Sequence, residues 1–332
     1  MPLIISVVVN CFSRKDYVKE ALKSICEQTI PRSEYEVILI KNFHDMAIDY
    51  FAEEKGIISI YTDELTTGSW FEIAANVAKG NYVSFLDDDD LMHPNKLEIM
   101  NSLIILNPDI DYFHNKLERS ESSFNYTGFD KSKVIYFKLD TARQLRKALK
   151  SKYYFNLSSV TVKRKILLDN MPYLRKTNHG TDFAIFFIAS LSGKTMIEYG
   201  EPLTFYRIHT DSRSNFKSKS RDEFEREKGK ELPNLLENWY TFSSMGNGSV
   251  LRKYASVRHT TTKIWINLIS PSRVYRVDIS EVIQNIRGIN LYPNFVFFVA
   301  INYLDCLFHK ATKKIYYMIL YSWLGWRLRE NI

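Results

Sequence analysis

The stretch Tyr82–Asp90, YVSFLDDDD, joins an apolar, strand-like run directly to four adjacent aspartates. A continuous apolar run of this length is typical of a strand buried on both faces. Four neighbouring carboxylates repel one another, so leaving them unpaired at the end of a strand is costly. The residues alone allow two interpretations. One is a solvated acidic turn that caps the helix expected from Pro94, and the other is a site for Mg²⁺ or Mn²⁺, which prefer carboxylate oxygens.

The segments on either side of this stretch alternate between strand-like and helix-like patterns. This alternation predicts an α/β fold with an open, mostly parallel sheet and helices on both faces. In such sheets the ligand binds beyond the carboxyl ends of the strands, so the residues that follow each strand are the candidates for a site. The further strands are expected at 4–9, 36–40 and 57–61, and the helices at 17–28, 71–78 and 94–106.

Beyond Asp109 the alternation becomes less regular. Strand-like pieces lie within 152–163 and 203–209, a helix is expected over 182–192, and the chain looks helical from Leu232 onward. The polar, charged stretch 212–230 is expected to be a flexible loop or linker. We therefore predict two domains, an α/β domain over 1–215 and a mainly helical region over 216–332.

Composition and cysteine usage exclude several classes of protein. The 332 residues are 45% hydrophobic and 25% charged, which excludes disorder as the main state. Three cysteines without a CxxC pair argue against a disulfide framework or a zinc knuckle and favour a reducing compartment. The first residues carry no basic segment before their apolar run, so they are interpreted as a strand and not as a signal peptide.

Positive charge and aromatic residues gather in the last part of the chain. Residues 239–332 hold 12 Lys and Arg against 4 Asp and Glu, and 17 of the 47 aromatic residues. Within them, 315–326 is an aromatic run flanked by basic residues. As a helix it would be about 18 Å long, too short for a hydrocarbon core of about 30 Å. The composition favours a helix lying on an anionic membrane surface, with packing against the first domain or in a homodimer as the alternative.

Three stretches of this sequence resemble the family 2 glycosyltransferases of GT-A fold. They are SVVVNCFSRKDYVKEALKSICEQT at 6–29, EVILI at 36–40 and YVSFLDDDDLMHPNKLE at 82–98. The family typically has SVVIPTYNR in the first of these places and FLDxDD in the last. The resemblance implies a metal-dependent, inverting transfer of a sugar from a nucleotide-sugar donor, with Mn²⁺ or Mg²⁺ as the cofactor.

The resemblance also implies roles for the residues at the ends of the strands. Asp87 and Asp89 occupy the two aspartate positions of the family's DxD motif, and Asp88 is the residue between them. Asp89 is the expected metal ligand, Asp87 is expected to face the metal or the ribose, and Asp88 to lie at the donor nucleotide. Asn10 and Phe12 stand where the family's first strand meets the nucleotide, with ordinary packing at the end of a strand as the alternative.

Two departures from the family pattern affect the choice of base. After EVILI the family usually has Asp-Asp, whereas this chain has Lys41-Asn42. The Asn42 amide still offers an acceptor and a donor to a pyrimidine, so a UDP-sugar is the favoured donor. The family's Ala-Arg-Asn before the metal-binding strand is also absent, and residues 68–70 are Gly-Ser-Trp instead.

The catalytic base and a second phosphate contact are expected in the later part of the first domain. Asp182 matches the Asp of the family's Glu-Asp pair, where a carboxylate accepts the proton of the acceptor hydroxyl; its alternative role is a helix N-cap. The stretch 203–209, LTFYRIH, resembles a family motif in which His209 completes the metal shell and Arg207 neutralises phosphate charge. Together these roles imply a single displacement with inversion at the sugar carbon.

Other function classes stay open at this point. The basic, aromatic tail also suits a nucleic-acid-binding module, although no such motif is present and no nucleic acid is expected as a partner. A nucleotidyltransferase would share the sheet and the acids but usually has a glycine-rich loop after its first strand. A catalytically silent relative that acts as a binding or scaffold protein is the third alternative. For the enzyme, we expect a glycan or polyprenol-linked acceptor and a cytoplasmic location, peripheral on the membrane.

Overall fold

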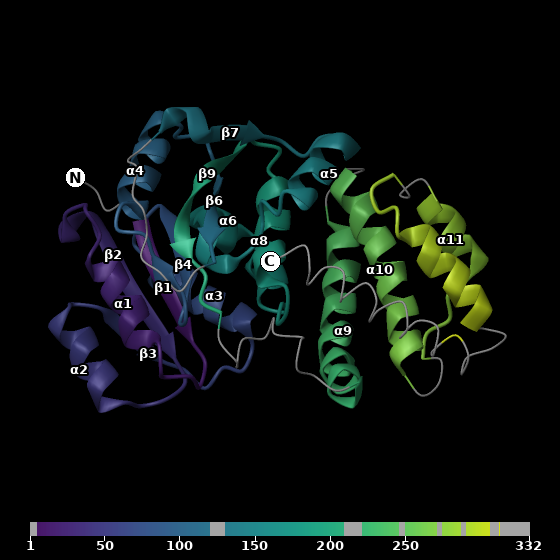
Figure 1. Ribbon diagram of the computed structural model, residues 1–332, viewed down its shortest axis with the longest axis horizontal. Helices are drawn as coiled ribbons and strands as arrows, with labels where there is room; N and C mark the ends of the chain where they lie inside the picture. The colour runs from purple at the N-terminus through teal and green to yellow at the C-terminus, as the bar shows by residue number, and fades with distance from the viewer. Residues whose placement is uncertain are drawn as a thin grey trace. The chain divides into compact units, whose positions relative to one another are not determined.

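The computed structural model divides into two compact units, Met1–Asn215 and Phe216–Ile332 (Figure 1). It describes residues 5–119, 130–208, 221–245, 250–270, 274–286, 290–305 and 312. The first unit is built on one sheet with helices packed against it, and the second is helical over its described residues. The predicted α/β class with a helical C-terminal region is confirmed.

Four parallel strands form one half of the sheet. They run in the order β3-β2-β1-β4, so the chain moves outward from β1 to β3 and then returns to the other side of β1. This reversal of strand order beside the first strand is where ligands of open α/β sheets bind. Nearly every side chain of β1, β2 and β4 is buried, as the continuous apolar runs predicted. The strands are β1 Ile5–Cys11, β2 Tyr35–Lys41, β3 Ile58–Tyr61 and β4 Tyr82–Asp87.

The helices that connect these strands follow from their apolar spacing and their caps. In α1 the buried residues Val18, Ala21, Leu22 and Ile25 recur at helical spacing and form one apolar face. The helix at 46–54 was not anticipated from the sequence; it begins after Asp45, whose carboxylate accepts two backbone N–H bonds from its first turn. The bounds are α1 Val18–Cys26, η1 Arg32–Glu34, α2 Met46–Glu54, α3 Thr67–Val77 and α4 Lys96–Leu106.

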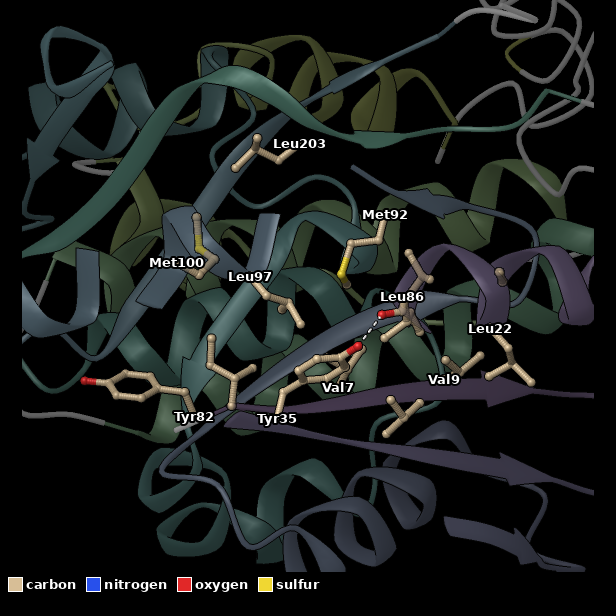
Figure 2. Close-up of a cluster of buried hydrophobic side chains, with 14 of the residues drawn as sticks. Val7, Val9, Leu22, Tyr35, Tyr82, Leu86, Met92, Leu97, Met100 and Leu203 are labelled. Carbon is tan, nitrogen blue, oxygen red and sulfur yellow. Dashed lines mark hydrogen bonds between the residues drawn. The ribbon is translucent and has the colours of Figure 1, made fainter. Parts of the chain in front are cut away.

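One large cluster of buried side chains lies between the sheet and helices α1 and α4 (Figure 2). Alternate residues of β1, such as Val7 and Val9, contribute to it together with Leu22 of α1 and Leu97 of α4. The intervening residues of the strands face the opposite side, where Phe85 of β4 meets Phe71 of α3 with ring centroids 5.2 Å apart. Both faces of the parallel strands are therefore covered, and only their ends are available to a ligand.

The second half of the sheet is mixed, which differs from the mostly parallel sheet that the sequence predicted. From β4 the order continues β8-β6-β9-β5; β8 is antiparallel to both β4 and β6, and β6 and β9 are parallel. The expected strand 203–209 is the end of the longer strand β9. The elements are β5 Leu91–Met92, β6 Tyr112–Glu118, η2 Lys131–Lys133, β7 Val134–Phe137, α5 Ala142–Lys150, η3 Leu157–Ser159, β8 Val160–Lys163, α6 Arg164–Asp169, α7 Met171–Leu174, α8 Thr181–Ser190 and β9 Met196–Phe205.

The second unit is built around a pair of long helices, α9 Arg221–Ser244 and α10 Val250–Ile269, with α11 Ile279–Asn285 following them. Part of the stretch expected to be a flexible linker is therefore the first turns of α9. The unit has its own apolar cluster, in which Leu232 of α9 and Ile264 of α10 are buried. None of the described helices combines the length and the hydropathy needed to cross a bilayer. The predicted interfacial helix at 315–326 lies outside the described residues.

We predict that Gly80→Ala lowers the free energy of unfolding by about 1 to 3 kcal/mol, because a Cβ there would overpack against β1. That Cβ would lie 2.7 Å from the backbone nitrogen of Ser6, and the Gly80 N–H also donates to the Ser6 hydroxyl at 2.9 Å. Gly229→Ala is the control, since apart from its neighbours and the nearby backbone of α9 no described atom lies within 4 Å of the added carbon. It is expected to stabilise by about 0.5 to 1 kcal/mol. Urea unfolding measures both, and equal midpoints would contradict the prediction.

Candidate functional site

The carboxyl ends of β1 and β4 lie side by side and bring the predicted residues of both strands together. Asn10 is the register partner of Asp87, so the end of β1 lies directly beside the acidic turn. The Oδ1 atom of Asn10 is buried and has no hydrogen-bond partner among the described residues. A buried amide oxygen of this kind is available to a ligand hydroxyl or N–H. Phe12, two residues on, is 45% exposed, with its ring centroid 5.8 Å from that of Trp70.

Arg14, from the loop after β1, forms ion pairs with two of the four aspartates. Its Nη2 atom pairs with Asp88 and lies 2.7 Å from an oxygen of Asp89. The Asp88 carboxylate is buried, and its other oxygen is 3.5 Å from the sulfur of Cys11. Burial raises the pKa of Asp88, while the Arg14 guanidinium opposes that shift. Asp88 is thus already paired inside the protein, and its predicted contact with the nucleotide stays a prediction.

Asp90 is satisfied by neutral donors instead of a cation. Its Oδ2 accepts from the Asn156 amide at 2.8 Å and from the Ser158 hydroxyl at 2.6 Å, and its Oδ1 accepts from the backbone N–H of Arg207 at 3.1 Å. The side chain is fully buried. Burial, together with the charge of Asp89, raises the pKa of Asp90 to about 6. Asp90 therefore fixes the turn from within and does not face a ligand.

Asp87 is the carboxylate that the protein leaves unpaired. Its side chain makes no hydrogen bond or ion pair with any of the described residues, although its backbone N–H donates to the Ser158 hydroxyl at 2.9 Å. Burial raises the pKa of Asp87 well above its usual range, and the charges of Asp90, Asp89, Asp88 and, last, Asp182 add to that shift. Asp182 therefore lies close enough to Asp87 for their charges to interact.

Asp182, the predicted base, lies in the first turn of α8. The N-cap of this helix is Gly180, in the left-handed conformation at φ 65°, so the alternative that Asp182 is the N-cap is wrong. One carboxylate oxygen accepts the backbone N–H of Phe183 at 2.7 Å. Burial raises the pKa of Asp182 to about 6, and that N–H and the nearby His114 partly oppose the shift. A carboxylate with this pKa is suited to accept a proton near neutral pH.

Arg207 joins the end of β9 to the acidic turn and to α1. Its Nε donates to the backbone carbonyl of Asp89 at 3.0 Å, and its Nη2 lies 2.6 Å from a carboxylate oxygen of Glu20. The guanidinium also stacks over the ring of Tyr17, 4.4 Å from its centroid. The structure thus places the predicted Arg207 at the site. His209, predicted as a metal ligand, lies outside the described residues.

The Lys41-Asn42 pair at the end of β2 has a local structural role. The Lys41 ammonium is buried, lies 2.8 Å from a carboxylate oxygen of Asp49 and donates to the carbonyl of Phe43 at 2.9 Å. The Oδ1 of Asn42 accepts the backbone N–H of Ser13 at 2.8 Å, which fixes the loop after β1 where Ser13 has a φ of 62°. Asn42 therefore supports the loop that carries Phe12, and its predicted contact with a base stays a prediction.

The carboxylate oxygens at the acidic turn fit a divalent cation that is bound together with a phosphate-bearing ligand. Across the described ranges, no group of three or more His, Cys, Asp or Glu side chains is arranged to hold a metal ion. Two carboxylates of the turn could nevertheless contribute to a cation site. Asp87 has no partner among the described residues, and Asp89 shares Arg14 with Asp88. Mg²⁺ is commonly bound by one or two carboxylates together with substrate phosphates, which matches this set.

Three residues of the site were not singled out from the sequence. Arg14 follows the first strand, and its position in the stretch that resembles the family was a usable signal. Asn156 and Ser158, in contrast, lie in an ordinary polar stretch whose contacts with Asp90 arise only from the fold. No periodicity or motif marks them.

We predict that Arg14→Met lowers the free energy of unfolding by about 3 kcal/mol, because it leaves the buried Asp88 carboxylate without its cation. Lys165→Met is the control, since its pair with Asp169 is exposed and such pairs contribute about 0.5 kcal/mol or less. Urea unfolding measures both. Equal losses in the two variants would contradict the importance assigned to the Arg14 pair.

Comparison with known proteins agrees with this geometry. The family model described as glycosyl transferase family 2 matches residues 6–167. An uncharacterized glycosyltransferase of Haemophilus influenzae is 28% identical over 127 residues, which cover 37% of this chain and 42% of the relative. A second uncharacterized glycosyltransferase, from Methanocaldococcus jannaschii, is 31% identical over 114 residues, which cover 32% of this chain and 39% of the relative. The aligned segments span less than half the length of either relative.

A solved structure shares the fold over most of the chain. The crystal structure of Staphylococcus aureus TarS 1–349 in complex with UDP-GlcNAc superposes with a TM-score of 0.58 at 15% identity, and covers 89% of this chain and 81% of that one. The family match includes most of β1, which carries Asn10, and the acidic turn with its four aspartates. The first unit of the chain is a GT-A domain of glycosyltransferase family 2.

Proposed function

We propose that this protein transfers a sugar from a UDP-sugar to an acceptor hydroxyl, with inversion at the sugar carbon. The observation that carries the proposal is the proximity of Asp182 to Asp87. It puts a carboxylate with a pKa of about 6 beside the acidic turn at the strand ends. A base next to a cluster suited to a cation and a diphosphate is the arrangement that a single displacement needs.

The donor would lie across the ends of β1 and β4. The exposed ring of Phe12 and the Asn10 Oδ1, which has no partner among the described residues, suit the nucleoside. Asp87, together with Asp89 beside Arg14, suits the diphosphate end through a cation. A divalent ion bound there would act as a Lewis acid on the departing diphosphate. Arg207, 3.0 Å from the Asp89 carbonyl, supplies positive charge at the same edge. The solved structure similar to this chain contains UDP-GlcNAc, which supports uridine as the base.

Asp182 would perform the chemical step that belongs to the protein. Its free carboxylate oxygen accepts the proton of the acceptor hydroxyl. At the same time the hydroxyl oxygen of the acceptor attacks the sugar carbon from the face opposite the diphosphate. The other oxygen is held by the N–H of Phe183, which fixes the rotation of the carboxylate. Because this pathway has no second nucleophile, the configuration at the sugar carbon inverts. The acceptor we propose is a glycan or lipid-linked glycan hydroxyl.

Binding of the donor tests the first half of this proposal. With Mn²⁺ present, calorimetry is expected to show UDP binding to the full chain, and chelator is expected to abolish it. Asp89→Ala should weaken this binding by more than about tenfold, because it removes one of two carboxylates available to the cation. Asp169→Ala, an exposed aspartate paired only with Lys165 in α6, is the control. Binding that is unchanged by chelator or by Asp89→Ala would refute the donor site.

Turnover against pH tests the base. UDP release from UDP-GlcNAc, with water or a glycan as the acceptor, should fall about tenfold per pH unit below pH 6, because protonated Asp182 cannot accept a proton. Asp182→Asn should lower kcat by about 10² to 10⁴ and leave UDP affinity within about twofold, since the amide keeps the shape of the side chain. Its residual rate should fall less steeply below pH 6 than that of the wild type, because Asp87 and Asp90, whose pKa values are also raised, remain in the variant. A variant that keeps the wild-type rate would rule Asp182 out.

A further inference from the structure

A buried polar network lies beneath the acidic turn and joins four parts of the first unit. Its centre is Ser158, in η3, whose side chain is fully buried. The hydroxyl accepts the backbone N–H of Asp87 at 2.9 Å and donates to Asp90 at 2.6 Å. The carbonyl of Ser158 accepts from the Lys96 ammonium at 2.5 Å and from the Thr204 hydroxyl at 3.0 Å. One serine therefore bonds to the end of β4, the turn, α4 and β9.

Asp90 extends this network to Arg207. Its second oxygen accepts the backbone N–H of Arg207, while the Arg207 guanidinium donates back to the carbonyl of Asp89. The turn is thus fixed at three places: the Asp87 N–H, the Asp89 carbonyl and the Asp90 carboxylate. None of these three contacts uses the carboxylate of Asp87 or that of Asp89, whose oxygen lies 2.7 Å from Arg14 Nη2.

Repulsion between the aspartates makes such anchoring necessary. Four adjacent carboxylates would move apart if the turn were free to rotate, and the side chains of Asp87 and Asp89 would then lose their common direction. Donors that are themselves buried and bonded hold the backbone against this force, as outer contacts commonly do around ligand-binding carboxylates. Lys96, with no exposed surface, donates to the network from beneath, and burial lowers the pKa of its side chain to about 7.

We propose that Ser158 is a positioning residue that sets the direction of the Asp87 and Asp89 carboxylates through its bonds to the Asp87 N–H and to Asp90. The role in catalysis rests on the proposed function, whereas the anchoring of the turn does not. Ser158 touches neither donor nor acceptor in this proposal. It acts through the backbone of β4 and through Asp90.

The test compares Ser158→Ala with Ser84→Ala and Ser158→Thr in the full chain. Ser84 lies in β4, the strand that ends at Asp87, and is as buried as Ser158. Among the described residues its hydroxyl accepts only from the Thr161 hydroxyl, at 3.0 Å and away from the turn. Ser158→Ala should lower kcat/KM for UDP-GlcNAc about 10- to 100-fold and raise the half-saturating Mn²⁺ concentration about tenfold. Its melting temperature should fall further than that of Ser84→Ala, because it loses two hydrogen bonds instead of one, so both variants are assayed well below their melting temperatures. Ser158→Thr, which keeps the hydroxyl, should recover most of the Mn²⁺ response.

Hydrogen exchange gives a second measurement that needs no turnover. In Ser158→Ala the amide of Asp87 loses its acceptor, so peptides covering 82–92 should exchange about tenfold faster there, with no such change in Ser84→Ala. Equal exchange and an equal Mn²⁺ requirement in the two variants would overturn the proposal. If the wild type released no UDP at all, the proposed function would fall, and the exchange measurement alone would decide whether Ser158 anchors the turn.

Discussion

The constraint on which the site depends is the placement of four adjacent carboxylates at the end of a buried strand. The protein meets it differently at each position. Asp88 and Asp89 share the guanidinium of Arg14, and Asp90 is bonded by neutral donors. Asp87 is left without a partner among the described side chains. Because each charge that is paired inside the protein removes one source of repulsion, the remaining negative potential is concentrated on the edge that faces a ligand.

The parallel half of the fold could be predicted because its information is local. Continuous apolar runs such as Val37–Ile40, short and rich in β-branched residues, indicate strands covered on both faces, and the spacing of apolar residues in α1 identifies its buried face. The mixed half could not be predicted in this way. The strand β5 has two residues and pairs with the distant β9, so its existence depends on a contact across more than one hundred residues. A pairing of this kind leaves no pattern in either segment.

Site residues could be predicted where they lie at the end of a strand. They could not be predicted where their role depends on contacts with segments distant in the sequence. Asn10 and Asp87 are neighbours because the register of β1 and β4 puts them opposite each other, which the strand-end argument anticipated. The opposite case is Asn42, whose amide holds the backbone of Ser13. Its predicted contact with a base stays a prediction, but residue type does not reveal that the amide oxygen also accepts a nearby backbone N–H. Ser158 escaped notice for the same reason, since a buried hydroxyl is defined only by its neighbours.

Charge also decides the order in which ligands can enter the proposed site. Two like charges 4 Å apart repel by about 4 kcal/mol at an effective dielectric constant of 20, so a diphosphate approaching the unpaired Asp87 alone would be opposed. Arg14 cannot offset this repulsion, because both of its partners are already aspartates. A divalent cation placed between the diphosphate of the donor and the Asp87 carboxylate would attract both, so that repulsion is replaced by attraction. If the proposed function holds, the cation and the nucleotide would therefore bind to this edge together.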